Sequence, residues 1–278
     1  MNTVFRLFLC LVCLALPLAN GYGSEGESTI QTNSAEQERK AGERMVLTIN
    51  DVEYAFRWCP PGTFMMGSWA GDPKISGDGI RHQVTLTRGF WMLETEVTQK
   101  MWESVMETNP SEFKGGKLPV ERVSWDDCQE YIEKLNALGS APKGYRFSLP
   151  TEARWEYACR ASTTTAYHFG NTLTKDQANF GRNVGQTSDV DSYPANVWGL
   201  YDMHGNVSEL CSDWYGNYPG DSMTDPTGAA SGSYRALRGG SWLHDAVGCR
   251  SAYRHNTIPS HRSSVIGVRL SLVCDEAK

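Results

Sequence analysis

Residues 202–209, with the sequence DMHGNVSE, have the types and spacing to hold a cation. The pattern Asp-x-x-Gly-x-Val-x-Glu is what a bent loop wrapped around one ion would need. Ca²⁺ prefers six to eight oxygen ligands, which mix carboxylates with main-chain carbonyls. A calcium-free turn whose carboxylates are solvated is the alternative for the same residues.

The cysteines form a second group of candidate residues. Two of the eight, Cys10 and Cys13, lie in the apolar N-terminal segment. The other six are Cys59, Cys128, Cys159, Cys211, Cys249 and Cys274. An even number permits disulfides in an exported protein, and the sequence leaves all pairings open. Buried apolar thiols are the alternative for several of them.

Other catalytic signatures are missing from the sequence. No two histidines before the C-terminal segment have the HxxxH or HxD spacing of a metal centre. GxSxG and glycine-rich phosphate-binding motifs do not occur. The net charge of −6 also argues against a nucleic-acid partner, because nucleic-acid-binding surfaces are basic.

The segment 243–265, LHDAVGCRSAYRHNTIPSHRSSV, has an unusual composition. It contains no Lys, Glu, Gln, Met or Trp, although these types make up roughly a fifth of an average soluble chain. Every type that is present can be reached from an AAC or AAT asparagine codon by changing only adenines, whereas the absent types cannot. An exposed loop that has drifted in sequence is the alternative explanation.

In the rest of the chain the sequence predicts little regular secondary structure. Alternation of apolar and polar residues predicts strands at 45–57 and 82–87. Three side chains are suited to capping a helix: Thr98, Ser124 (with Asp127 as a capping-box partner) and Thr151. After Ser124 an apolar helical face is predicted, formed by Trp125, Cys128, Tyr131, Ile132 and Leu135. Gly, Asn, Asp, Ser and Pro predict mainly turns and loops between 161 and 240.

The N-terminus resembles an export signal. Residues 1–21 combine Arg6, an apolar run over 7–18 and small residues at a plausible cleavage site. The run is too short to span a bilayer, and no other segment is apolar enough to do so. We therefore expect a signal peptide and an exported protein, in the periplasm, at the cell surface or outside the cell. Lipid attachment at Cys10 or Cys13 is the alternative way of anchoring the chain.

The rest of the chain reads as a linker followed by one domain. Residues 22–44 contain almost no large apolar side chains, which is typical of a solvated linker. Apolar patterning then continues without interruption, so we expect a single domain over 45–275. The composition, 40% hydrophobic and 21% charged, is that of a globular protein.

Eight motifs in this domain resemble, in order, the formylglycine-generating enzyme family, also called the sulfatase-modifying factor domain. They are PPGTFMMGS (60–68), GFWMLETEVTQKMW (89–102), LPVERVSWDDCQEYIEKL (118–135), RFSLPTEARWEYACRA (146–161), WGLYDMHGNVSEL (198–210), SDWYG (212–216), RALRGGSW (235–242) and IGVRLSL (266–272). The resemblance implies an α+β fold of the elaborated C-type-lectin-like type. It does not by itself imply catalysis, because this fold also supports binding proteins.

The family's oxidase binds Cu(I) with two cysteines that follow the GGS motif, and a thiolate pair suits this soft ion. His244 and Cys249 occupy those positions here, so the resemblance implies no formylglycine-generating activity. Copper bound at Cys249 remains an alternative. If a short gap is allowed when the chain is aligned with the family, Cys249 instead matches a family cysteine that is paired with the equivalent of Cys159. The resemblance thus implies a Cys159–Cys249 disulfide.

The resemblance also implies calcium ligands. For the loop at 202–209 they are the side chains of Asp202 and Glu209 and the carbonyls of Gly205 and Val207. A second site would begin at Asn179 and the Phe180 carbonyl, although the loop that follows it is shortened here. We therefore expect structural Ca²⁺.

The C-terminal segment resembles the variable region of proteins diversified by retroelements, which share this fold and vary between GGSW and a closing GxR. The resemblance implies a constant framework of Cys249, Arg250, Ser251, Arg254, Pro259 and Arg262. The diversified, ligand-contacting positions would be Leu243, His244, Asp245, Val247, Gly248, Tyr253, His255, Asn256, Thr257, Ile258, Ser260, His261, Ser263, Ser264 and Val265. Ala246 is left unassigned.

These features together favour an exported, non-catalytic protein that binds a protein or surface ligand through residues 243–265. A rigid scaffold that carries changeable Tyr, Ser, Asn and Gly side chains is how antibodies bind their ligands. One alternative is an oxidoreductase of the family that acts on protein cysteines, with Cys249 as nucleophile or copper ligand. Another is an accessory domain of the cell envelope without a dedicated ligand.

Overall fold

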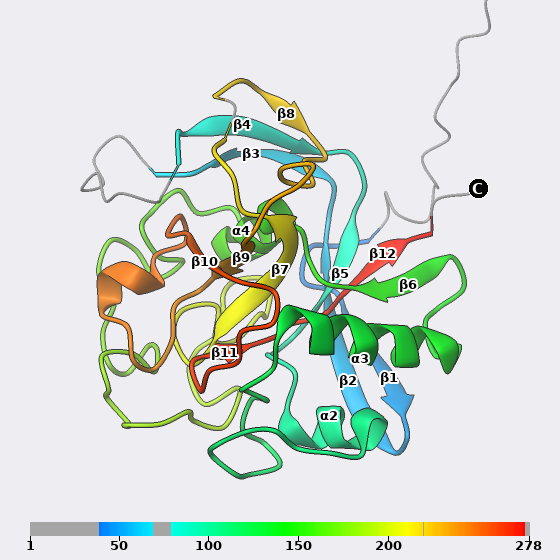
Figure 1. The fold of residues 1–278 in the computed structure, drawn as a ribbon. Helices are drawn as coiled ribbons and strands as arrows, with labels where there is room; N and C mark the ends of the chain where they lie inside the picture. The colour runs from blue at the N-terminus through cyan, green and yellow to red at the C-terminus, as the bar shows by residue number, and fades with distance from the viewer. Residues whose placement is uncertain (1–38, 69–78, 219, 276–278) are drawn as a thin grey trace, which may run out of the picture. The chain divides into compact units, whose positions relative to one another are not determined.

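The computed structural model describes residues 39–68, 79–218 and 220–275, in which three α-helices accompany three β-sheets (Figure 1). The largest sheet has the strand order β1-β2-β5-β12-β6, and all neighbouring strands are antiparallel. Its strands are β1 (Arg44–Ile49), β2 (Val52–Cys59), β5 (Phe90–Leu93), β12 (Ser271–Cys274) and β6 (Tyr145–Ser148). The last strand of the chain therefore lies inside this sheet, between β5 and β6.

The first two strands form a hairpin, which corrects the prediction of one strand over 45–57. Asn50 and Asp51 have φ angles of 47° and 61°, the left-handed conformation that a two-residue hairpin turn requires. The apolar–polar alternation continues on both sides of this turn, so alternation alone did not reveal it. The strand predicted at 82–87 is confirmed as β4 (His82–Leu86).

The described residues also form two smaller sheets. One has the order β10-β9-β7-β11, with β10 (His255–Thr257), β9 (Arg235–Arg238), β7 (Ser208–Trp214) and β11 (Ile266–Gly267). The other has the order β3-β4-β8, with β3 (Gly62–Met66) and β8 (Met223–Thr224) on either side of β4. Residues 243–265 connect β9 to β11 and contain both β10 and the 3₁₀-helix η1 (Ala246–Cys249).

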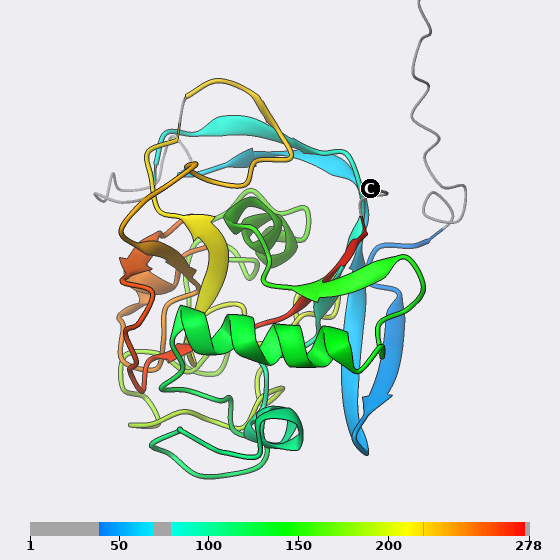
Figure 2. The same cartoon turned by 45° about the vertical axis from the view of Figure 1, so that its right-hand side comes forward.

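The three predicted helix caps are confirmed. Thr98, Ser124 and Thr151 precede α2 (Gln99–Met106), α3 (Trp125–Ala137) and α4 (Glu152–Arg160), and Ser124 forms the capping box with Asp127. Helix α3 lies across the five-stranded sheet (Figure 2) and buries Cys128, Tyr131, Ile132 and Leu135 in its core. Helix α4 packs in a second apolar cluster, which also contains residues of β4 and β7.

Residues 39–44 belong to the folded part, whereas they were expected in the linker. Gly42 N–H donates to the Trp58 carbonyl at 2.9 Å, and the Arg39 guanidinium lies 5.0 Å from the Trp58 ring centre. The predicted signal peptide and the rest of the linker, up to residue 38, lie outside the described residues. No helix within the described ranges has the length and apolar character needed to cross a membrane.

A buried ion pair joins the C-terminal strands to the rest of the domain. Arg269 and Glu209 are both buried, and the closest of their contacts is 2.7 Å. Trp155 Nε1 donates to the same carboxylate at 2.6 Å. Arg269 also donates to the carbonyls of Leu93 and Tyr201, at 3.0 and 2.8 Å. This side chain therefore connects its own segment to Leu93 on β5 and to the stretch that contains Tyr201 and Glu209.

We expect Arg269→Met to reduce the free energy of unfolding by about 3–5 kcal/mol, because the Glu209 carboxylate would stay buried without its counter-charge. Urea unfolding followed by tryptophan fluorescence measures this loss. Arg146→Met is the matched control, since Arg146 pairs with Asp275 at 3.8 Å with both side chains 55% exposed. Its effect is expected to stay below about 1 kcal/mol. Similar losses in the two variants would contradict a special role for the buried pair.

Candidate functional site

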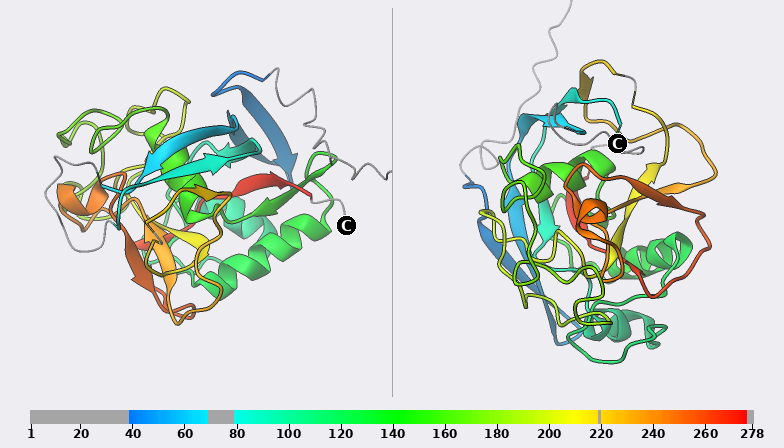
Figure 3. Two further views of the ribbon diagram at one scale, coloured as in Figure 1. Left: turned by 90° about the horizontal axis from the view of Figure 1, so that it is seen from above. Right: turned by 90° about the vertical axis from the view of Figure 1, so that its left-hand side faces the viewer.

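Most predicted variable positions carry side chains that reach solvent. In Figure 3 (right), η1 faces the viewer and β10 lies beside it. The exposed positions are Leu243, Asp245, Val247, His255, Ile258, Ser260 and His261. The partly buried positions are His244, Tyr253, Asn256, Ser263, Ser264 and Val265. We call these thirteen positions the variable surface.

Gly248 and Thr257 are buried, so we remove them from the candidate surface. Gly248 lies in η1, where its N–H donates to the Asp245 carboxylate at 3.1 Å. A Cβ at Gly248 would lie 3.1 Å from the His244 Cβ, so a side chain there would crowd its neighbour. Thr257 pairs with Arg235 in the β9–β10 ladder. Because strand residues alternate in direction, Thr257 and Asn256 face opposite sides.

The predicted framework residues lie mainly inside. Cys249, Arg250, Ser251 and Arg254 are buried, and Pro259 is partly buried. Arg262 is exposed, yet its Nε donates to the Asp127 carboxylate on α3 at 2.7 Å. Four of the six predicted framework residues are thus buried, whereas all thirteen positions of the variable surface are exposed or partly buried.

Hydrogen bonds to main-chain atoms fix the segment at several points. Ser251 N–H donates to the Ala166 carbonyl at 2.8 Å. The carbonyls of Pro259 and Ser263 accept from the main-chain N–H groups of Trp125 and Arg122, at 2.9 and 3.0 Å. Because these bonds involve only the backbone, they place few demands on the side chains of the segment.

Two buried arginines attach the same segment to helix α4. Arg254 donates to both oxygens of Glu152, at 2.6 and 2.7 Å. Arg238, on β9, donates to the carbonyls of Ser251 and Tyr253, at 2.7 and 2.8 Å. Arg238 also pairs with Glu156 on α4. Arg238 and its acidic partners were not predicted, although charged residues inside the otherwise apolar motifs WEYACR and RALRGG were an available signal.

The variable surface is shallow. A small depression is lined by His244, Tyr253 and His255, and the rings of the two histidines are 5.9 Å apart. Three large apolar side chains on it are more than a third exposed: Leu243, Val247 and Ile258. An open groove of about 650 Å³ adjoins the segment at Arg262 and continues along α3 past Glu130 and Lys134. The surface therefore combines apolar contact area with charged edges.

The structure holds Cys159 and Cys249 as free thiols, so the predicted disulfide is not formed in it. His204 contacts both residues. Its Nε2 lies 3.9 Å from the Cys159 sulfur, and its Nδ1–H donates to the Cys249 carbonyl at 2.7 Å. Burial raises the pKa of each thiol to about 12. A thiol with such a pKa is a poor nucleophile near neutral pH.

We expect iodoacetamide at pH 8 to leave Cys159 and Cys249 unmodified in the native protein, because roughly one thiol in 10⁴ would be ionised. Both should be alkylated in urea without reductant, as peptide mass spectrometry would show. If both cysteines resist alkylation in urea until dithiothreitol is added, they form the disulfide instead. Rapid labelling of native Cys249 would contradict the buried thiol and favour the oxidoreductase alternative.

The predicted calcium loop fits a cation only in part. Arg269 donates to both oxygens of the Glu209 carboxylate, so Glu209 is not presented to an ion. Asp202 is buried, and its Oδ2 accepts from Asp191 N–H at 2.8 Å. Glu96, which sequence reasoning missed, accepts from Val207 N–H at 3.2 Å. Within the described ranges no three His, Cys, Asp or Glu residues are grouped to hold a metal.

Asn179, predicted for the second calcium site, lies beside this loop. Its carbonyl accepts from Asn206 N–H at 2.8 Å. A Cβ at Gly205 would come within 2.3 Å of that carbonyl oxygen, so only glycine fits at this close approach. Among the described residues the side-chain oxygen of Asn179 is buried without a hydrogen-bond partner. An oxygen in this state is suited to a cation, and it is the one feature here that fits Ca²⁺.

Comparison with known proteins agrees with this architecture. Residues 55–273 match the model of the sulfatase-modifying factor enzyme 1-like domain. The solved structure of Treponema denticola variable protein 1 superposes with a TM-score of 0.74 and is 32% identical, covering 83% of this chain and 98% of that one.

Two curated relatives match shorter stretches. The formylglycine-generating enzyme of Streptomyces coelicolor is 38% identical over 172 residues, which are 54% of this chain and 51% of the enzyme. The serine/threonine-protein kinase pkn1 of Chlamydia caviae is 45% identical over 158 residues, 55% of this chain. The match spans only 24% of the kinase. The family match covers most of the described domain, and the chain belongs to the sulfatase-modifying factor enzyme 1-like family, with the α+β, C-type-lectin-like fold of formylglycine-generating enzymes.

Proposed function

We propose that this chain is an exported, non-catalytic binding protein whose variable surface is diversified between lineages. The observation that carries the proposal is the burial pattern of residues 243–265. Positions inferred to be constant lie mainly inside, while nearly all positions inferred to vary reach solvent. The similarity to Treponema denticola variable protein 1 over almost the whole of that chain supports it.

The environment of Cys249 supports a non-catalytic role. The thiol is buried, and burial raises its pKa to about 12. His244, at the position of the family's first catalytic cysteine, has its Nδ1 2.7 Å from Ser241 Oγ. Burial, with a smaller contribution from His255, lowers the pKa of His244, so its ring favours the neutral form.

The shape of the variable surface favours a macromolecular ligand, either a protein or a cell-surface polymer. Small-molecule sites are concave and enclose most of their ligand, whereas protein interfaces are broad and flatter. Leu243, Val247 and Ile258 supply apolar contact area, and Tyr253 adds an aromatic side chain of the kind that binding loops favour. The N-terminal segment 1–21 supports export of the chain.

Deep sequencing of codons 235–275 in many cells descended from one clone tests diversification directly. We expect substitutions to be confined to the variable surface and to adenines of the ancestral codons. Codons for Cys249, Ser251 and Arg254 should stay constant, because their side chains are buried. A uniform segment, or substitutions spread evenly over buried and exposed codons, would contradict the proposal.

A measurement of stability tests whether the fold tolerates substitutions on the variable surface. Replacing Leu243, Val247 and Ile258 together with Ser should change the free energy of unfolding by less than about 1.5 kcal/mol, since surface substitutions are usually near neutral. Arg254→Met should lower it by about 3 kcal/mol or more, because the buried Glu152 carboxylate would lose the guanidinium that donates to both of its oxygens and keep only the longer contact with Arg238. Equal destabilisation would show that the surface is part of the fold rather than free to vary.

We also propose that Ca²⁺ stabilises the fold through the side-chain oxygen of Asn179. Thermal unfolding in about 1 mM CaCl₂ should occur several degrees above that in EGTA, because an ion that binds only the native state stabilises it. Asn179→Ala should remove this difference. Identical melting curves of the unsubstituted protein in calcium and in EGTA would show that the predicted calcium is wrong.

A further inference from the structure

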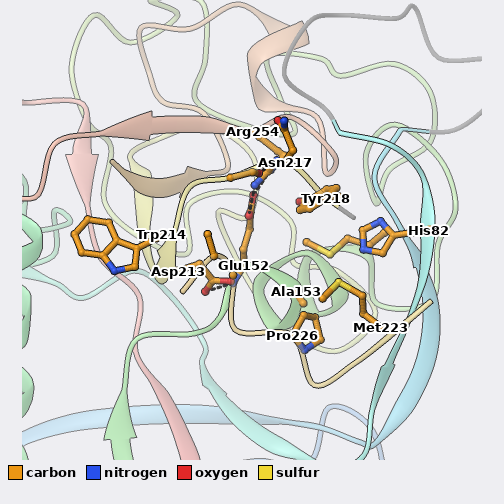
Figure 4. A pocket seen from close by; sticks show the side chains of 14 residues that line it. His82, Glu152, Ala153, Asp213, Trp214, Asn217, Tyr218, Met223, Pro226 and Arg254 are labelled. Atoms are coloured by element: carbon orange, nitrogen blue, oxygen red, sulfur yellow. Dashed lines mark hydrogen bonds and ion pairs between the residues drawn. The ribbon is translucent and has the colours of Figure 1, made fainter. Parts of the chain in front are cut away.

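A cavity of about 190 Å³ lies between helix α4, strands β3 and β4, and the loops that follow β7 (Figure 4). Arg254 lines it, whereas no residue of the variable surface does. A cavity of roughly 150 Å³ in another protein holds benzene, so this volume accommodates a ring-sized molecule. The cavity is therefore a second candidate site, separate from the proposed ligand-binding surface.

The walls of this cavity are mainly apolar. Met66, Ala153, Met223, Pro226 and Ala229 contribute aliphatic surface. The Tyr218 ring packs against the His82 imidazole with ring centres 4.7 Å apart. Apolar cavities hold water poorly, whereas an apolar molecule in them gains the free energy of leaving water.

His82 provides a hydrogen-bond acceptor without a partner in this wall, and the Tyr218 hydroxyl is a second buried polar atom without one among the described residues. The His82 side chain is only 3% exposed, and its Nδ1 lies 2.8 Å from the Ile80 carbonyl. A carbonyl only accepts, so Nδ1 must carry the proton, and Nε2 of the neutral ring presents a lone pair. Among the described residues Nε2 has no hydrogen-bond partner. Leaving such an atom buried and unpaired is unfavourable, and a donor on a ligand would recover that cost.

The charged groups of the cavity, Glu152, Arg254 and Asp213, already have hydrogen-bond partners. Glu152 and Arg254 pair through two hydrogen bonds, and Figure 4 shows this pair with Asp213 on the side away from His82 and Met223. Asp213 Oδ2 accepts from Glu152 N–H at 2.9 Å and from Ser212 Oγ at 3.0 Å. Burial, reinforced by the negative charge of Glu152, raises the pKa of Asp213 to about 7. An ionic ligand is therefore not needed to pair with any of these three groups.

We propose that this cavity binds one ring-sized, mainly apolar molecule with a single O–H or N–H group, which donates a hydrogen bond to Nε2 of His82. The aliphatic walls bind the ring, and His82 selects for the donor. A small number of placed polar groups in an apolar pocket is the usual arrangement of a small-molecule site. The proposal is independent of whether residues 243–265 are diversified.

Phenol and toluene are matched probes, because they share the ring and differ in the donor. Their dissociation constants for the full chain can be measured by ligand-observed NMR at pH 8. His82→Phe keeps a planar ring but removes the acceptor. We expect it to weaken phenol about tenfold, as the loss of one buried hydrogen bond predicts, and to change toluene less than twofold.

Two further variants keep the test decisive if His82→Phe does not fold. Ala229→Leu fills the cavity from an exposed loop position and should abolish binding of both probes. Ile258→Ser, on the variable surface, should leave both affinities unchanged. The proposal is overturned if neither probe binds at about 10 mM, a concentration at which even millimolar binding is detected. Binding that survives Ala229→Leu, or phenol affinity unaffected by His82→Phe, overturns it as well.

Discussion

The buried guanidinium of Arg238 holds residues 243–265 against the rest of the domain. This side chain lies on β9, pairs with Glu156 on α4 and donates to the carbonyls of Ser251, Ala252 and Tyr253. Removing a guanidinium from water costs several kcal/mol, which the paired carboxylate and several carbonyls offset only in a precise arrangement. Helix, sheet and segment therefore cannot shift independently, because any displacement would leave a buried charge without its partners.

This form of attachment explains how a rigid segment can carry changeable side chains. Arg238 binds carbonyl oxygens, which every residue possesses, and the contacts at Pro259 and Ser263 also use the main chain. Of the framework side chains that do contribute, Arg254 is buried, whereas Arg262 pairs with Asp127 at the surface. A substitution on the variable surface thus leaves the attachments intact. Since the backbone is fixed before a ligand arrives, little conformational entropy is lost on binding.

Local sequence patterns predicted the local structure, but they did not predict contacts between residues that are distant in the sequence. The Ser124–Asp127 capping box is complete within four residues, so the start of α3 could be predicted. The Arg269–Glu209 pair joins residues that are 60 positions apart, and nothing near Glu209 shows that a guanidinium, rather than an ion, takes its carboxylate. For the candidate site, the resemblance to retroelement-diversified proteins divided residues 243–265 into framework and variable positions. It could not detect that Thr257 is turned inward, because strand direction depends on pairing with β9.

Cys249 shows that a redox site and a binding surface make opposite demands on this segment. A reactive thiolate needs an accessible, electropositive environment that lowers its pKa. Cys249 is instead buried at the end of η1, and its carbonyl accepts from His204. A side chain at Gly240 would come within 2.6 Å of the Cys249 sulfur, so the thiol fills the space beneath the GGSW turn. Exposing this thiol to a substrate would require a displacement of the backbone that positions the variable surface, because the sulfur is packed beneath that backbone.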